Sequence, residues 1–241
     1  MNILLLGYGK MGKVIEGIAK ERNHTIVAAI NQDNTAALDE LDTRPIDAAI
    51  EFTQPDAAVQ NIRWCIDHQI PVISGTTGWL DQKPEVDEYC RQNNGSLFYA
   101  ANFSIGVNLF FHLNRYLADI MKNFTNYRVE ASETHHTEKK DAPSGTALHL
   151  VKDIIRANPA LKDWALTGQQ ETEEQQTIPV QAYRETDVPG THTIKYRAEI
   201  DEITITHQAF SRKGFALGAV MIAEWIPDKS GVLSMDDYLV L

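Results

Sequence analysis

The densest group of chemically active side chains lies between Glu133 and Ala147, in the sequence ETHHTEKKDAPSGTA. Two histidines, His135 and His136, and two lysines, Lys139 and Lys140, stand just before a Pro-Ser-Gly-Thr helix start. Cations beside the free N–H groups of a helix start form a natural binding site for carboxylates. His135 or Lys139 could also donate a proton, since either side chain can be tuned to titrate near neutral pH. The segment predicts a site that binds an anion and moves a proton.

Three other interpretations of this segment deserve comparison. A metal site built from His135, His136 and Glu138 is awkward, because adjacent residues of a strand point to opposite faces, and we predict no metal. Ser144 lacks the G-x-S-x-G elbow of a serine hydrolase. A solvated, charged loop would explain the lysines but not the helix start that follows them directly.

A glycine-rich loop, GYGKMG, matches the pattern G-x-G-x-x-G near the N-terminus. It follows the apolar run Asn2–Leu6 and opens a helix predicted over Lys10–Glu21. In such a loop the first glycine allows a tight turn, the second lets the backbone approach a pyrophosphate, and the third lets helix and strand pack closely. The helix N-terminus adds N–H groups and a partial positive charge. This context predicts a dinucleotide site, rather than a merely structural turn, formed by Gly7, Tyr8, Gly9, Lys10, Met11 and Gly12.

The position that reads the cofactor ribose is less informative. NAD sites usually place Asp or Glu at the end of the second strand, whereas NADP sites prefer a nearby Arg. Here the predicted strand Thr25–Ile30 is followed by Asn31, Gln32 and Asp33. Asp33 could reach the ribose or could cap a turn. The choice between NADH and NADPH therefore stays open.

The elements that position these residues follow two patterns, and the first is a regular alternation of strands and helices. Strand, helix and strand within the first 30 residues form one right-handed βαβ unit. The alternation continues to residue 100 and predicts a Rossmann-type doubly wound parallel sheet. The predicted strands are Asn2–Leu6, Thr25–Ile30, Ala48–Glu51, Val72–Ser74 and Ser96–Ala100, and the helices are Lys10–Glu21, Asp56–His68 and Gln82–Asn93.

After Asn102 the alternation stops, which predicts a second, α+β domain built on an open mixed sheet. A polar loop is expected over Gln169–Thr177. The predicted domains are 1–106 with 213–241 for the dinucleotide, and 107–212 for the substrate and for oligomerisation. The predicted elements are helices over Ile105–Lys122, Thr146–Ala157 and Gly214–Trp225, and strands over Tyr127–Thr134, Ile178–Tyr183, His192–Arg197 and Ile203–Ala209.

Composition excludes several classes of function. The 241 residues carry a formal net charge of −11, which repels phosphate backbones and argues against a nucleic-acid partner. Cys65 and Cys90 have no metal-ligand spacing and form no disulfide framework, so a reduced, cytoplasmic protein is expected. No apolar run approaches the ~20 residues needed to cross a bilayer, and the N-terminus has no signal-peptide pattern.

Six segments together resemble the dihydrodipicolinate reductases, a family of the diaminopimelate route to lysine. The string His-His-x-x-Lys-x-Asp-Ala-Pro-Ser-Gly-Thr-Ala is highly specific to that family, and it follows a Rossmann unit as the family requires. The resemblance covers nearly the whole chain. Its segments are Gly7–Gly12, Gly75–Gly78, Ala100–Asn108, Glu133–Leu148, Gly190–Thr193 and Thr206–Arg212.

The resemblance implies the substrate and the reaction. NADH or NADPH would pass a hydride to C4 of the unsaturated heterocycle formed when hydroxy-tetrahydrodipicolinate loses water. His135 would be the acid/base group and Lys139 the proton donor. His136 and the backbone N–H groups of Gly145 and Thr146 would bind a carboxylate of this small dicarboxylate substrate.

The resemblance also implies the rest of the cofactor site and the assembly. Asn31 would lie at the adenosine end, although relatives often carry an acid followed by a base where this chain has Asn31 and Gln32. Arg212 is a further cofactor contact, and the assembly implied is a homotetramer built through the sheet of the second domain. The nicotinamide would lie over Gly75, Thr76, Thr77, Ala100, Ala101, Asn102 and Phe103.

Two rival functions remain at this stage. One is another two-domain NAD(P) dehydrogenase acting on an amino-acid precursor, such as an aspartate or semialdehyde dehydrogenase. A catalytic cysteine would favour the semialdehyde enzyme, but Cys65 and Cys90 both fall within predicted helices. The other is a non-catalytic nucleotide sensor, which would be expected to carry a degraded His-Lys segment, whereas that segment is intact here.

Overall fold

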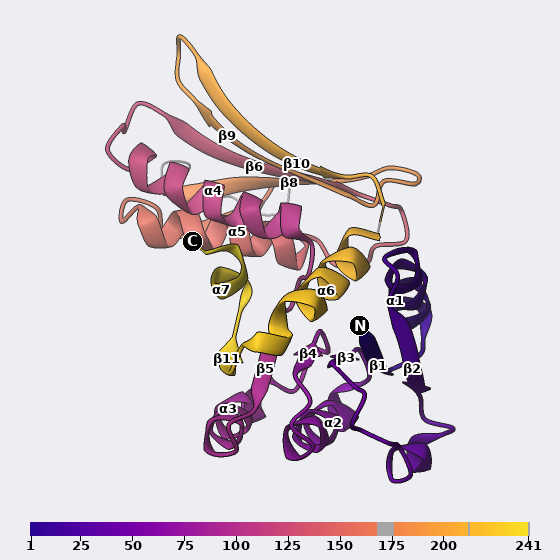
Figure 1. Ribbon diagram of the computed structural model, residues 1–241. Helices are drawn as coiled ribbons and strands as arrows, with labels where there is room; N and C mark the ends of the chain where they lie inside the picture. The colour runs from indigo at the N-terminus through magenta and orange to yellow at the C-terminus, as the bar shows by residue number, and fades with distance from the viewer. Residues whose placement is uncertain (168–175, 212, 241) are drawn as a thin grey trace. The chain divides into compact units, whose positions relative to one another are not determined.

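Two units make up the chain in the computed structural model, which describes residues 1–167, 176–211 and 213–240 (Figure 1). The first unit comprises Met1–Ile105 and Lys213–Leu241, and the second comprises Gly106–Arg212. The first boundary lies one residue before the predicted one. Arg212 and most of the predicted loop Gln169–Thr177 lie outside the described residues.

The first unit is built on a six-stranded sheet in which every pairing is parallel. The strand order is β11-β5-β4-β3-β1-β2, which confirms the predicted doubly wound sheet. The direction of the chain across the sheet reverses at β1, since β2 lies on one side of it and β3 on the other. The strands are β1 (Asn2–Leu6), β2 (Thr25–Ile30), β3 (Ala48–Glu51), β4 (Val72–Ser74), β5 (Ser96–Tyr99) and β11 (Gly231–Leu233).

Helices cover both faces of this sheet, which explains why its strands are mostly apolar. In β1, Ile3 and Leu5 pack into the core on the α1 and α6 side, while Leu4 and Leu6 pack against α2 and α3. Within the described residues, no helix is both long and apolar enough to cross a membrane. The helices are α1 (Lys10–Glu21), α2 (Pro55–Asp67), α3 (Lys83–Gln92), α6 (Lys213–Trp225) and α7 (Met235–Leu239), with single-turn helices η1 (Thr35–Leu38), η2 (Leu80–Gln82) and η3 (Ile226–Asp228).

The second unit is built on a five-stranded mixed sheet, as predicted, with the order β10-β9-β6-β8-β7. Its central strand β6 pairs in parallel with β8 and antiparallel with β9. Two helices, α4 and α5, lie side by side over one face of the sheet (Figure 1) and share its apolar core. The elements are α4 (Ile105–Met121), β6 (Arg128–His135), α5 (Gly145–Ala157), β7 (Asp163–Leu166), β8 (Thr177–Arg184), β9 (Gly190–Arg197) and β10 (Glu202–Ala209).

Three short elements, besides the single-turn helices η1, η2 and η3, were not predicted from the sequence. These are β7, β11 and α7, with four, three and five residues respectively. Segments of this length complete too few periods to show either the alternation of a strand or the 3.6-residue repeat of a helix. Their pairing with longer neighbours, such as β11 with β5, stabilises them.

Candidate active site

The glycine loop has the geometry expected of a dinucleotide loop. Gly7 turns the chain at the end of β1 with a φ of +98°, and a Cβ there would lie 2.0 Å from the carbonyl oxygen of Phe52. A Cβ on Gly12 would lie 2.2 Å from the carbonyl oxygen of Gly7, so helix and strand pack as closely as the third glycine allows. A Cβ on Gly9 would meet nothing within 4 Å. The second glycine therefore faces open space, where a pyrophosphate can approach the backbone.

A cavity of about 360 Å³ opens beside this loop, at the carboxyl ends of β1, β2 and β3. Ligands of open parallel sheets bind at this kind of position, where the strand order reverses. Gly7, Tyr8, Gly9 and Asn31 line the cavity, whereas the predicted residues Lys10–Gly12 form the first turn of α1 and are not part of its lining. The cavity and the open glycine together fit the adenosine and pyrophosphate part of a dinucleotide.

The ribose end of the cavity is formed by a turn that two asparagines hold. Asn31 Oδ1 accepts a hydrogen bond of 2.8 Å from the Asp33 backbone N–H, and the Asn31 N–H donates one of 2.6 Å to Asn34 Oδ1. The side chains of Asn31 and Asn34 thus cap this turn, a role that was also considered for Asp33 from the sequence. Gln32 and Asp33 line the cavity, and none of its described lining residues is Lys or Arg.

A buried carboxylate joins the ends of β3 and β4 next to the predicted nicotinamide turn. Glu51, the last residue of β3, is fully buried. It accepts hydrogen bonds from Ser74 Oγ at 2.6 Å, from Thr76 Oγ1 at 2.8 Å and from the Thr53 backbone N–H at 3.0 Å. The Thr76 side chain is therefore used to hold the strand ends together. The next residue, Thr77, is exposed. Glu51 was not selected from the sequence, because an acid at the end of a buried strand was the only signal that pointed to it.

The segment after β5 that is predicted to contact the cofactor has some residues in the core and others at the surface. Phe103 is buried, and its ring centroid lies 5.4 Å from that of Phe52 and 6.0 Å from that of Phe98. Its side chain belongs to the core, so a cofactor contact here would use the backbone. Ala100 is buried as well, Ala101 is exposed, and Asn102 Oδ1 accepts a hydrogen bond of 2.9 Å from the Ser104 N–H.

In the second unit, Glu133 joins the end of β6 to the start of α5. The Ser144 backbone N–H lies 3.1 Å from each oxygen of the Glu133 carboxylate. Ser144 is the N-cap residue of α5, and its Oγ accepts a hydrogen bond of 3.2 Å from the Ala147 N–H. The next residues, Gly145 and Thr146, form the first turn, whose N–H groups have no partner within the helix. The predicted carboxylate-binding groups are thereby fixed to the sheet.

The loop between β6 and α5 is held by a residue from another strand. Arg184, at the end of β8, donates hydrogen bonds to the backbone oxygens of Asp141 at 2.7 Å and Lys139 at 3.3 Å. Lys139 Nζ donates to Asp141 Oδ1 at 2.8 Å, and this ammonium lowers the pKa of Asp141. The strand register places Arg184 opposite His135. Arg184 was not identified from the sequence because it lies far from the His-Lys segment along the chain. The predicted substrate-binding residue His136 directly follows β6 and is half-buried.

Two buried imidazoles lie next to each other at this end of the sheet. His135 and His192, from β6 and β9, have ring centroids 5.0 Å apart, and His192 Nε2 lies 3.2 Å from Ser144 Oγ. Burial lowers the pKa of His135, an effect that the Glu133 carboxylate partly offsets. Burial, together with the neighbouring His135, His207 and Lys139, lowers the pKa of His192 to about 3. Both rings are therefore neutral at neutral pH, and His135 can accept or pass on a proton.

The structure groups three possible metal ligands that differ from the set weighed in the sequence. One ligand atom each from Glu133, His135 and His192 lie within 4.8 Å of one another. The Glu133 Oε2 atom lies 3.6 Å from His135 Nδ1 and 3.8 Å from His192 Nε2. Ser144 already bonds both Glu133 Oε2 and His192 Nε2. Ser144 thus links Glu133 and His192 by hydrogen bonds, whereas His135 packs against His192 and its Nδ1 has no hydrogen-bond partner among the described residues.

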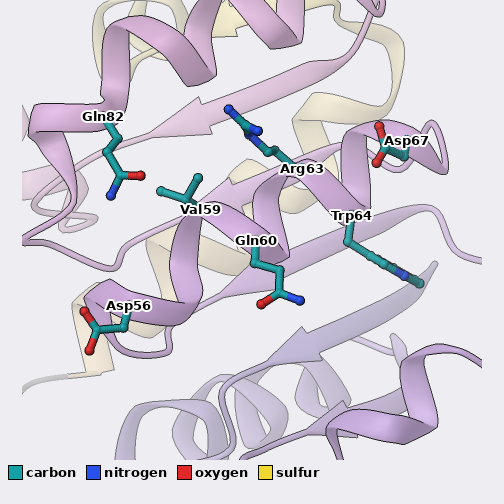
Figure 2. Close-up of a pocket in the computed structure, with 7 residues that line it drawn as sticks. All are labelled: Asp56, Val59, Gln60, Arg63, Trp64, Asp67 and Gln82. Carbon is teal, nitrogen blue, oxygen red and sulfur yellow. The ribbon is translucent and has the colours of Figure 1, made fainter.

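A second cavity, of about 500 Å³, lies along α2 (Figure 2). Arg63 and Trp64 line it, but Arg63 Nη2 bonds Glu85 at 2.6 Å and the Trp64 ring stacks on His68 at a centroid distance of 4.2 Å. None of the described residues around it belongs to the predicted site. The chemistry is therefore concentrated at the glycine loop and at the end of β6.

Comparison with known proteins gives consistent matches along the whole chain. Residues 1–103 match the family model "Dihydrodipicolinate reductase, N-terminus" and residues 106–239 match "Dihydrodipicolinate reductase, C-terminus". The chain is 49% identical over 239 residues to the 4-hydroxy-tetrahydrodipicolinate reductase of Christiangramia forsetii, covering 99% of this chain and 98% of that protein. It is 36% identical over 216 residues to the protein of the same name from Methanocaldococcus jannaschii, covering 84% and 76%.

Two solved structures share the fold. The dipicolinate-bound dihydrodipicolinate reductase of Paenisporosarcina sp. TG-14 has a TM-score of 0.77 at 20% identity and covers 99% of both chains. The amine dehydrogenase of Mycobacterium smegmatis has a TM-score of 0.61 at 8% identity, covering 98% of this chain and 95% of that one. At these identities the structural likeness speaks for the fold alone.

Proposed function

The chain belongs to the dihydrodipicolinate reductase family, and from this premise we propose how its residues divide the reaction. The protein reduces 4-hydroxy-tetrahydrodipicolinate with a nicotinamide cofactor, a step of the diaminopimelate route to lysine. The curated relative from Christiangramia forsetii matches over 99% of the chain. This full-length match, with the His-Lys segment intact, decides against another dehydrogenase and against a non-catalytic sensor.

One observation carries the assignment of roles in the second unit, namely the attachment of the α5 start to β6 through Glu133 and Ser144. It puts a helix N-terminus, which favours anions, at the same end of β6 as the catalytic candidates. The N–H groups of Gly145 and Thr146, with His136, would bind one carboxylate of the substrate. A dianionic substrate is thus held in a chain whose net charge is −11, because the local groups oppose the global charge.

The proton chemistry falls to two side chains. We assign the acid/base role to His135, which is neutral at neutral pH because burial lowers its pKa. We assign the proton-donor role to Lys139, whose ammonium Asp141 holds at 2.8 Å. When bound, the nicotinamide supplies the hydride. The residues that would hold the cofactor are Gly7, Tyr8, Gly9, Lys10, Met11, Gly12, Asn31, Gly75, Thr76, Thr77, Ala100, Ala101, Asn102, Phe103 and Arg212.

For the cofactor, we propose a preference for NADH. A 2′-phosphate is normally met by Arg, whereas the described lining of the ribose end contains Gln32 and Asp33 and no basic residue. The Asp33 carboxylate suits a ribose hydroxyl and repels a phosphate. Gln32→Arg should therefore raise the use of NADPH while leaving the use of NADH nearly unchanged.

A steady-state assay with synthase-generated substrate tests the function and the preference together. The expected kcat/KM for NADH exceeds that for NADPH by about tenfold, which corresponds to about 1.4 kcal/mol. Equal values for the two cofactors would contradict the preference. The absence of turnover with both cofactors would contradict the proposed roles of the site residues.

For the assembly and its location, we propose a cytoplasmic homotetramer built through the sheet of the second unit. The edge strand β10 is exposed or half-buried along its whole length, and an uncovered edge or face of a sheet favours association. Cys65 and Cys90 are free thiols, as expected in a reducing compartment. Light scattering should give four times the 27.1 kDa mass of the chain; a monomer mass would contradict the tetramer.

A further inference from the structure

Glu133 is a buried carboxylate to which the reaction has so far given no role. Its side chain has no exposed surface, and Arg184 Nη1 lies 3.6 Å from its Oε1. Burying an ionised carboxylate is costly, and apolar residues of similar volume often replace such groups without loss of stability. The position of Glu133 on β6 therefore needs a reason beyond the fold, and its two other contacts provide one.

The first contact is with His135. The Nδ1 atom of His135 faces Glu133 Oε2 at 3.6 Å and, among the described residues, has no hydrogen-bond partner. On the other side of the ring, a Cβ on Gly190 would lie only 3.1 Å from His135 Nε2, so glycine leaves room at that nitrogen. Contacts of catalytic groups are often long before the substrate binds and tighten in the complex. A carboxylate opposite Nδ1 favours the tautomer that carries its proton there.

The second contact is with Ser144, whose backbone N–H lies 3.1 Å from both carboxylate oxygens. Ser144 caps the helix whose first turn is the proposed carboxylate site. The same carboxylate thus touches the acid/base group and the substrate-binding helix start. Strand β9 closes the arrangement, since its register places His192 opposite Glu133 and His192 Nε2 lies 3.2 Å from Ser144 Oγ.

We infer that Glu133 is a positioning residue, an inference that rests on the proposed function: it fixes the Nδ1–H tautomer of His135 and ties that ring to the start of α5. In this arrangement His135 exchanges the reaction's proton at Nε2 while Nδ1 keeps its own proton. Glu133 does not itself touch the substrate.

The electrostatic surroundings of His135 predict the direction of a pH effect. Burial, Lys139 and Arg184 lower the pKa of His135, whereas the carboxylates of Glu133 and Asp141 raise it. Removing the charge of Glu133 therefore lowers the pKa of His135 further. The charged and titratable groups that face this ring are Glu133 on β6, Lys139 and Asp141 in the following loop, Arg184 on β8 and His192 on β9.

The variant Glu133→Gln tests the inference, because it keeps the volume of the side chain. The amide oxygen can still accept the Ser144 N–H, but the amide NH₂ can donate to His135 Nδ1 and so favour the wrong tautomer. We expect kcat to fall by about 10²–10⁴, the range for a misoriented acid/base group. The KM and the affinity for dipicolinate should stay within about threefold, and the limb of the pH profile that reports His135 should move to lower pH.

Two further variants separate positioning from structure. Glu130→Gln makes the same change on β6, on the opposite face of the sheet because 130 and 133 differ by an odd number, and should leave kcat and the pH profile unchanged. Glu133→Asp keeps the charge on a shorter side chain and should recover part of the kcat lost in Glu133→Gln. NADH affinity, measured by fluorescence titration, should be the same in all three variants.

Several results would overturn the inference while leaving the proposed function in place. A Glu133→Gln enzyme with the kcat and pH profile of the active wild type is one. Loss of dipicolinate binding and of thermal stability without a shift of the pH limb is another, since it would make Glu133 purely structural. Wild-type activity that EDTA abolishes and Zn²⁺ restores would make the cluster a metal site. An inactive wild type would instead contradict the proposed function itself.

Discussion

Lys139, the proposed proton donor, is held by contacts within its own loop and with β8. Its ammonium contacts Asp141 at 2.8 and 2.9 Å, and Arg184 holds the backbone of both residues. Lys139→Ala should therefore reduce kcat by about 10²–10⁴, the usual effect of removing a proton donor. NADH affinity should not change. A steady-state assay paired with calorimetric titration of NADH measures both.

The exposed neighbour Lys140 provides the matched control for this prediction. Lys140→Ala removes the same charge from the same loop and should leave kcat nearly unchanged. Wild-type turnover by the Lys139→Ala enzyme would remove Lys139 from the mechanism.

Gly9 is the residue at which cofactor binding and folding can be separated. A Cβ at Gly9 would meet nothing within 4 Å, so Gly9→Val should fold normally and yet obstruct the pyrophosphate. We expect NADH affinity to fall by at least about 100-fold in calorimetry, with an unchanged urea midpoint. Gly17→Val, on the same helix and also with nothing within 4 Å of its Cβ, should retain NADH affinity. Tight NADH binding by Gly9→Val would refute the role of the glycine loop.

At the scale of elements, the carboxyl ends of β3 and β4 depend on one acidic side chain. Glu51→Leu would leave the hydroxyls of Ser74, Thr76 and Thr53 without the carboxylate that accepts their hydrogen bonds. Unsatisfied buried polar groups are costly, so the free energy of unfolding should fall by about 1–3 kcal/mol. NADH affinity should fall as well, because Thr53 lines the cavity.

Urea denaturation and NADH titration measure the two effects of Glu51→Leu. The exposed Glu40 offers a control, since Glu40→Leu should change the free energy of unfolding by less than about 0.5 kcal/mol. Unchanged stability in Glu51→Leu would show that the ends of β3 and β4 hold together without the carboxylate.

For the whole molecule, the buried histidines make stability depend on pH. The pKa of His192 is lowered from 6.5 to about 3 by burial and by the neighbouring His135, His207 and Lys139. Because the folded pKa lies below the unfolded one, this contribution to stability is complete above pH ~6.5 and is lost as the pH falls toward 3. Within that window the free energy of unfolding should decrease by up to about 1.4 kcal/mol per pH unit.

Urea midpoints between pH 7 and pH 4 test this pH dependence. His192→Asn should give a shallower slope than the wild type, and the exposed His68→Asn should keep the wild-type slope. Equal slopes in the His192→Asn protein and the wild type would assign the acid sensitivity to other groups.

The local pattern of residues was sufficient for the strands and helices that alternate up to residue 100, and it marked the segments in which the site is proposed. The apolar run Asn2–Leu6 and the amphipathic segment Lys10–Glu21 each show a clear local pattern, and the glycine loop and the His135–Thr146 segment are contiguous. For this reason the doubly wound sheet and the second, mixed sheet were predicted from the pattern of elements, and the family from the resemblance of the contiguous segments. Short elements such as β7 were missed because they complete too few periods.

Tertiary structure decided which distant residues serve those segments. Whether His192 stands opposite Glu133, or Arg184 opposite His135, depends on strand order and register, and a shift of one residue would turn each side chain to the other face. Glu51 and Ser74 meet for the same reason, since β3 and β4 pair in parallel. The sequence by itself determined the chemical groups and the elements that carry them. Only strand pairing determined which buried carboxylates lie beside those groups and hold them in place, because pairing brings together residues that are far apart in the sequence.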